Sequence, residues 1–295
     1  MTDVELPNIL SGYHLANDPV STAARRRLTV GSRDVLALSD GFFTLEGAHE
    51  FLGSPTHPTA GYEQLHKIHG EVRMPLGCFL VPGEVTTLID LGMGPVDSGG
   101  AGVLVGGNLL RQLRSVGYAP ADIDLIALSH LHPDHVGWLA TASGEPVFPH
   151  ATVVFGRADW TYFVEESHPG LALAENIRAG LLTLASQGRV NLLDDDRQIV
   201  SGITRLAAPG HTPGHSLYAI HDGGERALLF GDAMYCPQQL TSLDWAAASD
   251  VDPVLARRTR EFYLRDLDAH GGIGLGCHFP ALQAGRVLGG QWREL

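Results

Sequence analysis

Four side chains that can bind a metal ion lie within six consecutive residues of this sequence, directly after an apolar run. The run is LIALS at residues 125–129, and the four side chains are His130, His132, Asp134 and His135. A short continuous apolar run predicts a buried strand, and a loop that leaves such a strand is held by a rigid scaffold. Transition metal ions bind imidazole and carboxylate groups that converge to within about 2.0 to 2.2 Å of the ion. The segment therefore predicts a fold in which a buried strand opens onto a metal site.

The spacing divides these four side chains into two pairs. His130 and His132 alternate as the chain leaves the strand, so both can face one side of the loop. Pro133 restricts the backbone at the next step, and we expect Asp134 and His135 to turn towards a neighbouring position. Two pairs of ligands on one loop indicate a site for two metal ions, which also needs a carboxylate that can bridge them.

Three more candidate ligands each follow a predicted strand. They are His211 in APGHTPGH, Asp232 in LLFGDAMY and His278 in LGCHFP. A single histidine among the 15 of this chain is more often solvated or hydrogen-bonded than bound to metal. Seven candidates at strand ends, five imidazoles and two carboxylates, favour a metal centre over that interpretation.

Strand and helix patterns alternate along the chain without an obvious boundary. Neither a Ser/Gly-rich linker nor a charge block divides the sequence, and no repeat has a period of about 20 to 50 residues. Residues 1–30 have mixed composition and predict an N-terminal arm, which is compatible with contact to another subunit in a homodimer. We predict that residues 31–295 form one α/β catalytic domain.

Local patterns predict where some strands and helices lie. A strand pattern near the N-terminus breaks at Asp40-Gly41, as a strand entering a turn would. Apolar spacing predicts a helix over residues 103–118 and another helix that begins at Val136. The later part of the chain returns to strands.

Charge and cysteine content exclude several partners. The formal net charge of −13 repels phosphate backbones and anionic lipid headgroups, so we expect neither nucleic acid nor a membrane as a partner. The start of the sequence lacks the features of a secretion signal, and no window approaches the roughly 20 apolar residues of a membrane span. Cys78, Cys236 and Cys277 lack CxxC spacing, which predicts buried thiols in a reducing compartment. We therefore expect a soluble, cytoplasmic protein.

The motifs around the candidate ligands resemble those of the metallo-β-lactamase superfamily. They are SHLHPDHVG, PGHTPGH, FGDAMY and CHFP in this order, and LIDLG upstream is similar to the family's first motif. The resemblance runs from about Val30 to the C-terminus. It implies an αββα sandwich of two mixed β-sheets flanked by helices, with two divalent metal ions, which we expect to be zinc, at one edge. It also implies the ligands: His130, His132 and His211 for the first ion, Asp134, His135 and His278 for the second, and Asp232 as the bridge.

Differences from several branches of the superfamily narrow the class. Zinc β-lactamases typically carry a cysteine where this chain has Asp232, and flavo-diiron proteins carry a glutamate in place of His132. RNA-processing members add a nuclease domain and a basic surface. Glyoxalase II adds a C-terminal helical domain, for which residues 279–295 are too few. The remaining resemblance is to N-acyl homoserine lactonases and methyl parathion hydrolase-like enzymes.

Tyr235 favours the quorum-quenching lactonases within this branch. It stands three positions after Asp232, similar to the tyrosine that those enzymes direct at the substrate carbonyl. The resemblance implies that a metal-held hydroxide opens a small-molecule lactone, that Tyr235 donates to the oxyanion and that Asp134 relays a proton to the leaving alkoxide. Three alternatives remain open: a packed Tyr235, the same site acting on phosphotriesters, aryl esters, thioesters or β-lactams, and a metal-storing or metal-sensing protein without turnover.

Other residues have more modest predicted roles. Asp90 is predicted to receive the far N–H of a ligand histidine, and His215 either supports its loop or touches substrate. Cys277, beside His278, has two predicted orientations: towards the metals, or away from them as is normal for a strand residue adjacent to a ligand. His66 and His69 are predicted to lie on the surface. The candidates for an apolar acyl pocket, all equally consistent with core packing, are Phe42, Phe43, Trp138, Trp160 and Phe163.

Overall fold

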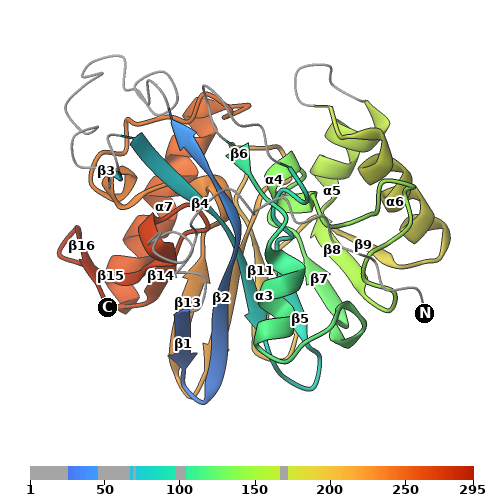
Figure 1. Ribbon diagram of the computed structural model, residues 1–295. Helices are drawn as coiled ribbons and strands as arrows, with labels where there is room; N and C mark the ends of the chain where they lie inside the picture. The colour runs from blue at the N-terminus through green and yellow to red at the C-terminus, as the bar shows by residue number, and fades with distance from the viewer. Residues whose placement is uncertain (1–25, 46–66, 69–70, 97–103, 167–171) are drawn as a thin grey trace.

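Two β-sheets lie face to face at the centre of the protein, with helices on both outer sides (Figure 1). The structure is a computed structural model that describes residues 26–45, 67–68, 71–96, 104–166 and 172–295. The predicted αββα sandwich of two mixed sheets with flanking helices is confirmed.

The first sheet is built from the earlier part of the chain. Its order is β1 (Arg26–Val30), β2 (Arg33–Leu45), β4 (Glu71–Val81), β5 (Thr87–Ile89), β7 (Leu125–Ala127), β8 (Thr152–Gly156) and β9 (Val190–Leu193), with β3 (Lys67–Ile68) beside β4 and β6 (Leu104–Val105) beside β2. The strands from β1 to β5 pair antiparallel, whereas β5, β7, β8 and β9 pair parallel. Because parallel strands end at the same edge of a sheet, the loops that follow β5 and β7 lie at one edge.

The second sheet is built from the later part of the chain. Its order is β10 (Arg197–Val200), β11 (Ile203–Ala207), β12 (Ser216–Asp222), β13 (Glu225–Leu229), β14 (Ile273–Leu275), β15 (Ala284–Leu288) and β16 (Gln291–Glu294). β13 and β14 pair parallel, and the other neighbours pair antiparallel. The ends of β13 and β14 and the connection from β11 to β12 therefore share one edge.

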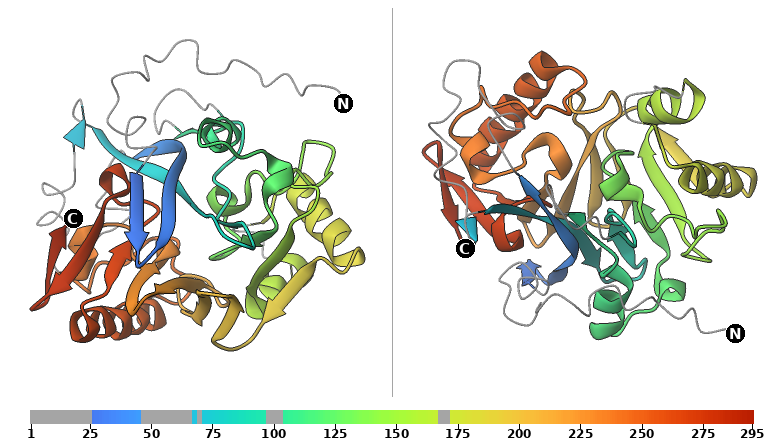
Figure 2. Two further views of the ribbon diagram at one scale, coloured as in Figure 1. Left: turned by 90° about the horizontal axis from the view of Figure 1, so that it is seen from below. Right: turned by 45° about the horizontal axis from the view of Figure 1, so that its top comes forward.

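Helices cover the outer face of each sheet. α7 (Pro253–His270) lies on one side of the sandwich, and α3 (Leu109–Ser115) and α6 (Glu175–Ser186) lie on the other (Figure 2). Two short helical turns, α4 (Pro133–Val136) and α5 (Arg157–Asp159), occur in the loops that follow β7 and β8. Among the residues described, no helix is both long enough and apolar enough to cross a membrane.

The core divides into three layers because neighbouring residues on a strand face opposite sides. Between the sheets, Ala37 and Ala127 of the first sheet are buried with Leu229 of the second. On the outer face of the first sheet, Ile126 is buried with apolar residues of α3 and α6. On the outer face of the second, Leu228 is buried with apolar residues of α7. One step along β7 or β13 thus crosses from an inner layer to an outer one, so these strands are apolar on both faces.

The predicted turn at Asp40-Gly41 is wrong, because β2 continues through this pair with a bulge. A Cβ at Gly41 would lie 1.8 Å from the carbonyl oxygen of Val105, so only glycine allows β6 to come this close. The carboxylate of Asp40 is fully buried and accepts five hydrogen bonds, from the backbone N–H groups of Met93, Gly94, Gly107 and Leu109 and from the indole of Trp138. The pair ties β2 to neighbouring loops instead of turning the chain.

The two predicted helices also differ from the structure. α3 begins at Leu109 rather than at residue 103, because Leu104–Val105 pair with β2 as β6. No helix begins at Val136 in the described chain, because the short α4 ends at this residue. Residues 26–30 of the predicted arm form β1, and the rest of that arm lies outside the described residues, as do His66 and His69. The arm, the single catalytic domain and the homodimer stay predictions.

Candidate metal centre

The seven predicted ligands meet at one edge of the sandwich. His130, His132, Asp134 and His135 follow β7, and α4 begins between the first pair and the second. The other three lie in the β11–β12 connection, after β13 and after β14, and are His211, Asp232 and His278. The structure brings all seven together, and their assignment as metal ligands stays a prediction.

The first cluster contains three histidines and Asp232, with one ligand atom from each within 4.8 Å of the others. The Nδ1 atom of His132 lies 2.9 Å from the Nε2 atoms of both His130 and His211. The Oδ2 atom of Asp232 lies 3.7 Å from His130 Nε2 and 3.3 Å from His211 Nε2. This grouping matches the first set of ligands that the family resemblance implies.

The second cluster gathers around the other oxygen of Asp232. Oδ1 lies 3.1 Å from the Nε2 atoms of both His135 and His278. The Oδ2 atom of Asp134 lies 3.6 Å and 3.5 Å from the same two nitrogens. Because its two oxygens face different clusters, Asp232 has the geometry of a bridging carboxylate.

The donor set fits divalent transition metal ions. Nε2 of His135 and Nε2 of His278 are buried and have no hydrogen-bond partner among the described residues, although both face Asp232. Nδ1 of His132 lies within hydrogen-bond distance, 2.9 Å, of two other imidazole nitrogens, and a metal ion between the three rings would accept a lone pair from each of them. Five imidazoles and two carboxylates on two adjoining positions are ligands that zinc and similar ions bind.

Burial and neighbouring charges fix the protonation of these groups. Burial and the adjacent histidines hold the pKa of His130 and of His132 well below the usual value. Burial alone would raise the pKa of Asp232, but the histidines around it dominate and hold the pKa well below the usual range. Burial alone would lower the pKa of His135 and of His278, but the carboxylates around them dominate and raise it. The rings with a lowered pKa are neutral, which is the form that binds a metal ion, whereas a metal ion at the second cluster would displace protons from its histidines.

Asp90 supports the second cluster, as the sequence predicts. Its Oδ2 atom lies 3.0 Å from Nδ1 of His135, and both of its oxygens accept hydrogen bonds from Ser129, one from the backbone N–H and one from the hydroxyl. A carboxylate on the far ring nitrogen directs Nε2 of His135 towards the cluster. Asp90 itself has the left-handed φ of 60°, which turns the chain at the end of β5.

His215 supports Asp232 through a hydrogen bond to its backbone. Its Nε2 atom accepts a hydrogen bond of 3.0 Å from the backbone N–H of Asp232. Burial holds the pKa of His215 well below the usual value, so the ring is neutral and able to accept. Of the two predicted roles, support of the loop is the one that this contact favours.

Asp250 is a site residue that the sequence did not reveal. Its Oδ1 atom lies 2.9 Å from Nδ1 of His211, and its side chain is completely buried. In the sequence it stands just before Pro253, where aspartates usually cap a helix. Asp252 is the residue that caps α7, by accepting from the backbone N–H of Leu255 at 2.9 Å. No local signal separates the capping aspartate from the one that turns inward.

Cys277 also lies in the centre, which is the less usual of its two predicted orientations. Its Sγ atom is 3.3 Å from Oδ1 of Asp232, and the second cluster of mutually close ligand atoms contains Cys277 in place of Asp134. β14 ends at Leu275, so Cys277 lies in a turn, where the alternation of a strand no longer applies. As predicted, all three cysteines are free and buried.

Tyr235 lies against both clusters. Its ring stacks on His278 with centroids 5.0 Å apart, and its hydroxyl is 3.1 Å from Oγ of Ser249. The pKa of Tyr235 is raised well above its usual value by burial and by the nearby carboxylates of Asp232 and Asp134. The phenol therefore keeps its proton and remains a hydrogen-bond donor.

Two of the five predicted pocket aromatics touch the centre. Phe43 meets His278 edge-on at 5.2 Å, and Phe163 meets His132 edge-on at 5.6 Å, measured between ring centroids. Trp138 is buried in the outer core, where its indole donates to Asp40. The remaining two also pack away from the histidines, Phe42 under the guanidinium of Arg73 and Trp160 beside Phe155.

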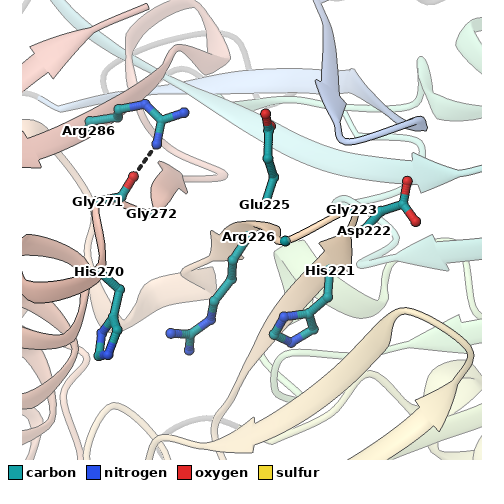
Figure 3. Close-up of a pocket in the computed structure, with 10 residues that line it drawn as sticks. His221, Asp222, Gly223, Glu225, Arg226, His270, Gly271, Gly272 and Arg286 are labelled. Atoms are coloured by element: carbon teal, nitrogen blue, oxygen red, sulfur yellow. Dashed lines mark hydrogen bonds between the residues drawn. The ribbon is translucent and has the colours of Figure 1, made fainter.

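A hollow of about 560 Å³ lies at the opposite end of β12 and β13 (Figure 3). Basic side chains surround it, but Arg226 pairs with Asp266 at 2.6 Å and Arg286 donates to the carbonyl oxygen of Gly271. His270 lies 3.3 Å from the same Asp266 carboxylate. Since these charges are engaged with the protein itself, the hollow is not a second candidate centre.

Comparison with known proteins shows similarity over more than half of this chain. The sequence model of the metallo-beta-lactamase superfamily matches residues 78–269. An N-acyl homoserine lactonase from a Bacillus species is 28% identical over 211 residues, which cover 65% of this chain and 78% of that protein. The N-acyl homoserine lactonase AttM from Agrobacterium fabrum is 29% identical over 167 residues, 54% of this chain and 60% of that protein.

Solved structures share the fold. AidC, a dizinc quorum-quenching lactonase in complex with a product, superposes with a TM-score of 0.77 and 22% identity over 92% of this chain and 97% of that chain. The hydrolase AbOPH superposes with a TM-score of 0.77 and 24% identity over the same shares of the two chains. At these identities, the likeness establishes the architecture and leaves the substrate to be argued from the site.

Proposed function

This chain belongs to the metallo-beta-lactamase superfamily, and on that premise we propose that it is a metal-dependent hydrolase that opens the ring of an N-acyl homoserine lactone. The observation that carries the choice of a lactone is Tyr235, a protonated phenol stacked on His278 and facing the bridging position of Asp232. Curated relatives at 28% and 29% identity are N-acyl homoserine lactonases, which supports the same choice.

Two divalent metal ions, zinc by preference, would be held by the seven predicted ligands. His130, His132 and His211 would hold one ion, Asp134, His135 and His278 the other, and Asp232 both. When bound, two such ions lower the pKa of a shared water towards neutrality and so supply a hydroxide nucleophile. A side-chain nucleophile is then unnecessary.

Tyr235 would donate a hydrogen bond to the lactone carbonyl oxygen. Negative charge develops on that oxygen during attack, and a donor fixed in advance stabilises it. The stacking on His278 and the contact with Ser249 both fix the hydroxyl. Burial strengthens the effect, because the phenol cannot be screened by water.

Asp134 would move the proton to the leaving alkoxide. Its side chain is 23% exposed, whereas that of Asp232 is 2% exposed. A carboxylate at the open side of the centre can reach both the substrate and solvent, which a general acid and base requires. Asp232 is enclosed by histidines, so we assign it metal binding and no part in proton transfer.

Phe43 and Phe163 would form the start of an apolar surface for the acyl chain. Both rings lie edge-on against ligand histidines, His278 and His132 respectively. Aromatic side chains beside a few polar groups are the usual composition of small-molecule sites.

A panel of substrates tests this proposal. Zinc-loaded protein is incubated with an N-acyl homoserine lactone, a phosphotriester, an aryl ester, a thioester and a β-lactam, and the products are identified by mass spectrometry. Ring-opened acyl homoserine as the best product supports the lactonase. A faster reaction with another class would keep the hydrolase and replace its substrate, and no reaction with any of the five would favour metal storage or sensing.

A further inference from the structure

We propose that Arg260, a buried arginine of α7, positions Asp250 beneath His211 and thereby sets the affinity of the first cluster for metal. The inference rests on the metal-binding part of the proposed function and is independent of the substrate. It assigns a role to the charged side chain with the lowest exposure in α7, 1%.

α7 is the support on which the His211 loop rests. Thr259 donates a hydrogen bond of 2.6 Å to the carbonyl oxygen of Pro209, and Tyr263 donates one of 2.8 Å to that of Ala207. Gly210 has a φ of 134°, and a Cβ there would lie 2.2 Å from the backbone nitrogen of Ala256. The loop and the helix are therefore packed too closely to move independently.

Arg260 differs from these neighbours because it reaches a charge rather than the loop backbone. Its Nη1 atom lies 3.5 Å from Oδ2 of Asp250. Its Nε and Nη2 atoms are buried and find no acceptor among the described residues. A buried guanidinium is costly unless a nearby anion compensates it. Asp250 is the partner that accounts for its burial.

Asp250 passes this constraint on to the metal centre. One oxygen, Oδ1, lies 2.9 Å from Nδ1 of His211, and the other accepts from the backbone N–H of Ala247 at 3.2 Å. A carboxylate that receives the Nδ1–H of a histidine leaves Nε2 free to bind metal and fixes the plane of the ring. Without Arg260, the buried carboxylate of Asp250 would lose the only arginine or lysine that pairs with it in the described chain. We expect it then to shift away from the ring of His211.

The second cluster is built differently. Asp90, which supports His135, receives its hydrogen bonds from Ser129 and forms no ion pair with an arginine within the described residues. Arg260 therefore acts on one cluster only. Loss of Arg260 should lower the affinity of the first cluster for its metal ion and leave the affinity of the second cluster nearly unchanged.

Zinc affinity measured without substrate tests the proposal. The variants are Arg260→Met, Arg260→Lys, Asp250→Asn and the double variant Arg260→Met/Asp250→Asn. Arg257→Met is the matched control, because Arg257 lies on the same helix in an exposed pair with Asp244 at 3.0 Å. Competition with a chromogenic chelator gives both dissociation constants, and the absorption spectrum of the cobalt-substituted protein reports ligand geometry.

Arg260→Met should raise the dissociation constant of one zinc ion about tenfold or more and alter the cobalt spectrum, with Arg260→Lys closer to wild type and Arg257→Met unchanged. If Arg260 acts through Asp250, the double variant should bind zinc no more weakly than Asp250→Asn alone. A folded Arg260→Met with wild-type zinc affinity would overturn the inference, as would additive losses in the double variant. If Arg260→Met does not fold, Asp250→Asn with wild-type affinity overturns it instead. If wild-type protein binds no zinc, the proposed function fails together with this inference. If wild-type protein binds zinc and Arg260→Met binds it equally well, only this inference fails.

Discussion

The ring of Tyr235 stacks on that of His278, with centroids 5.0 Å apart and planes inclined by 19°. The contact places a protonated phenol at the edge of the second cluster and fixes it by a residue that is itself a predicted ligand. Removing the hydroxyl should leave this stack in place. The roles of binding metal and stabilising charge can therefore be separated by substitution.

Tyr235→Phe should lower the turnover number about tenfold or more, because one fixed donor to the developing oxyanion is lost. Its zinc content should equal that of wild type, since the aromatic ring still packs on His278. Steady-state kinetics with a medium-chain N-acyl homoserine lactone, together with metal analysis of the same sample, gives both quantities. An unchanged turnover number would assign Tyr235 to packing.

Asp232→Ala and His132→Ala should abolish hydrolysis and reduce the bound metal. Asp232 faces both clusters through its two oxygens, so its loss should affect both ions, whereas His132 belongs to the first cluster alone. Metal analysis after dialysis against metal-free buffer measures the difference. Full activity with two ions retained in either variant would contradict the dinuclear assignment.

Gly231→Ala should destabilise the protein and lower its zinc content. Gly231 has a φ of 52°, and a Cβ there would lie 2.8 Å from Nε2 of His215 and 2.8 Å from Cβ of Ser129. Gly289→Ala is the matched control, because its φ is 59° but nothing lies within 4 Å of a Cβ. Both variants carry the backbone cost of about 1 to 2 kcal/mol. Thermal unfolding should show a larger loss of stability for Gly231→Ala than for Gly289→Ala. Equal losses of stability would show that the added methyl group causes no clash at Gly231.

Asp159 should make the stability of the metal-free protein depend on pH. Its carboxylate holds the loops of the centre by accepting from Thr212 at 2.9 Å and from the backbone N–H of Gly214 at 2.6 Å. Burial raises its pKa to about 6 from the ordinary value of 3.8 for an aspartate. The folded state therefore binds the proton more tightly, so the contribution to stability is greatest at low pH and declines as pH rises from about 4 to 6.

Asp159→Asn removes this titration. Between about pH 5 and pH 7.5, wild type should lose about 1 kcal/mol of unfolding free energy relative to Asp159→Asn. Urea unfolding of both metal-free proteins at the two pH values measures the change. A difference between the two proteins that stays constant with pH would show that Asp159 titrates normally.

Much of the fold could be predicted because its signals are local. The apolar run before His130 predicts a buried strand, and that run is β7, which is covered on both faces. The spacing of the histidine segment is local in the same sense, since α4 begins at Pro133 and separates the two pairs of candidate ligands. Short-range patterns are reliable where the strand, the turn and the burial all agree.

What the sequence did not reveal depends on contacts between distant segments. Asp250 and Asp252 look alike before Pro253, and only the packing of α7 on the His211 loop turns one of them inward. The pair Asp40-Gly41 is typical of a turn, yet its carboxylate binds backbone groups more than 50 residues away. Leu104–Val105 fit a helical pattern but pair with β2. Tertiary hydrogen bonding overrides local preference in each case.

The most direct test of a two-metal lactonase is proton release when a medium-chain N-acyl homoserine lactone is added to purified protein of known zinc content, with Asp232→Ala measured alongside. The account predicts one proton for each lactone opened by protein that carries about two zinc ions, and none above background from Asp232→Ala. No release from wild-type protein loaded with two zinc ions, or equal release from the variant, would contradict it.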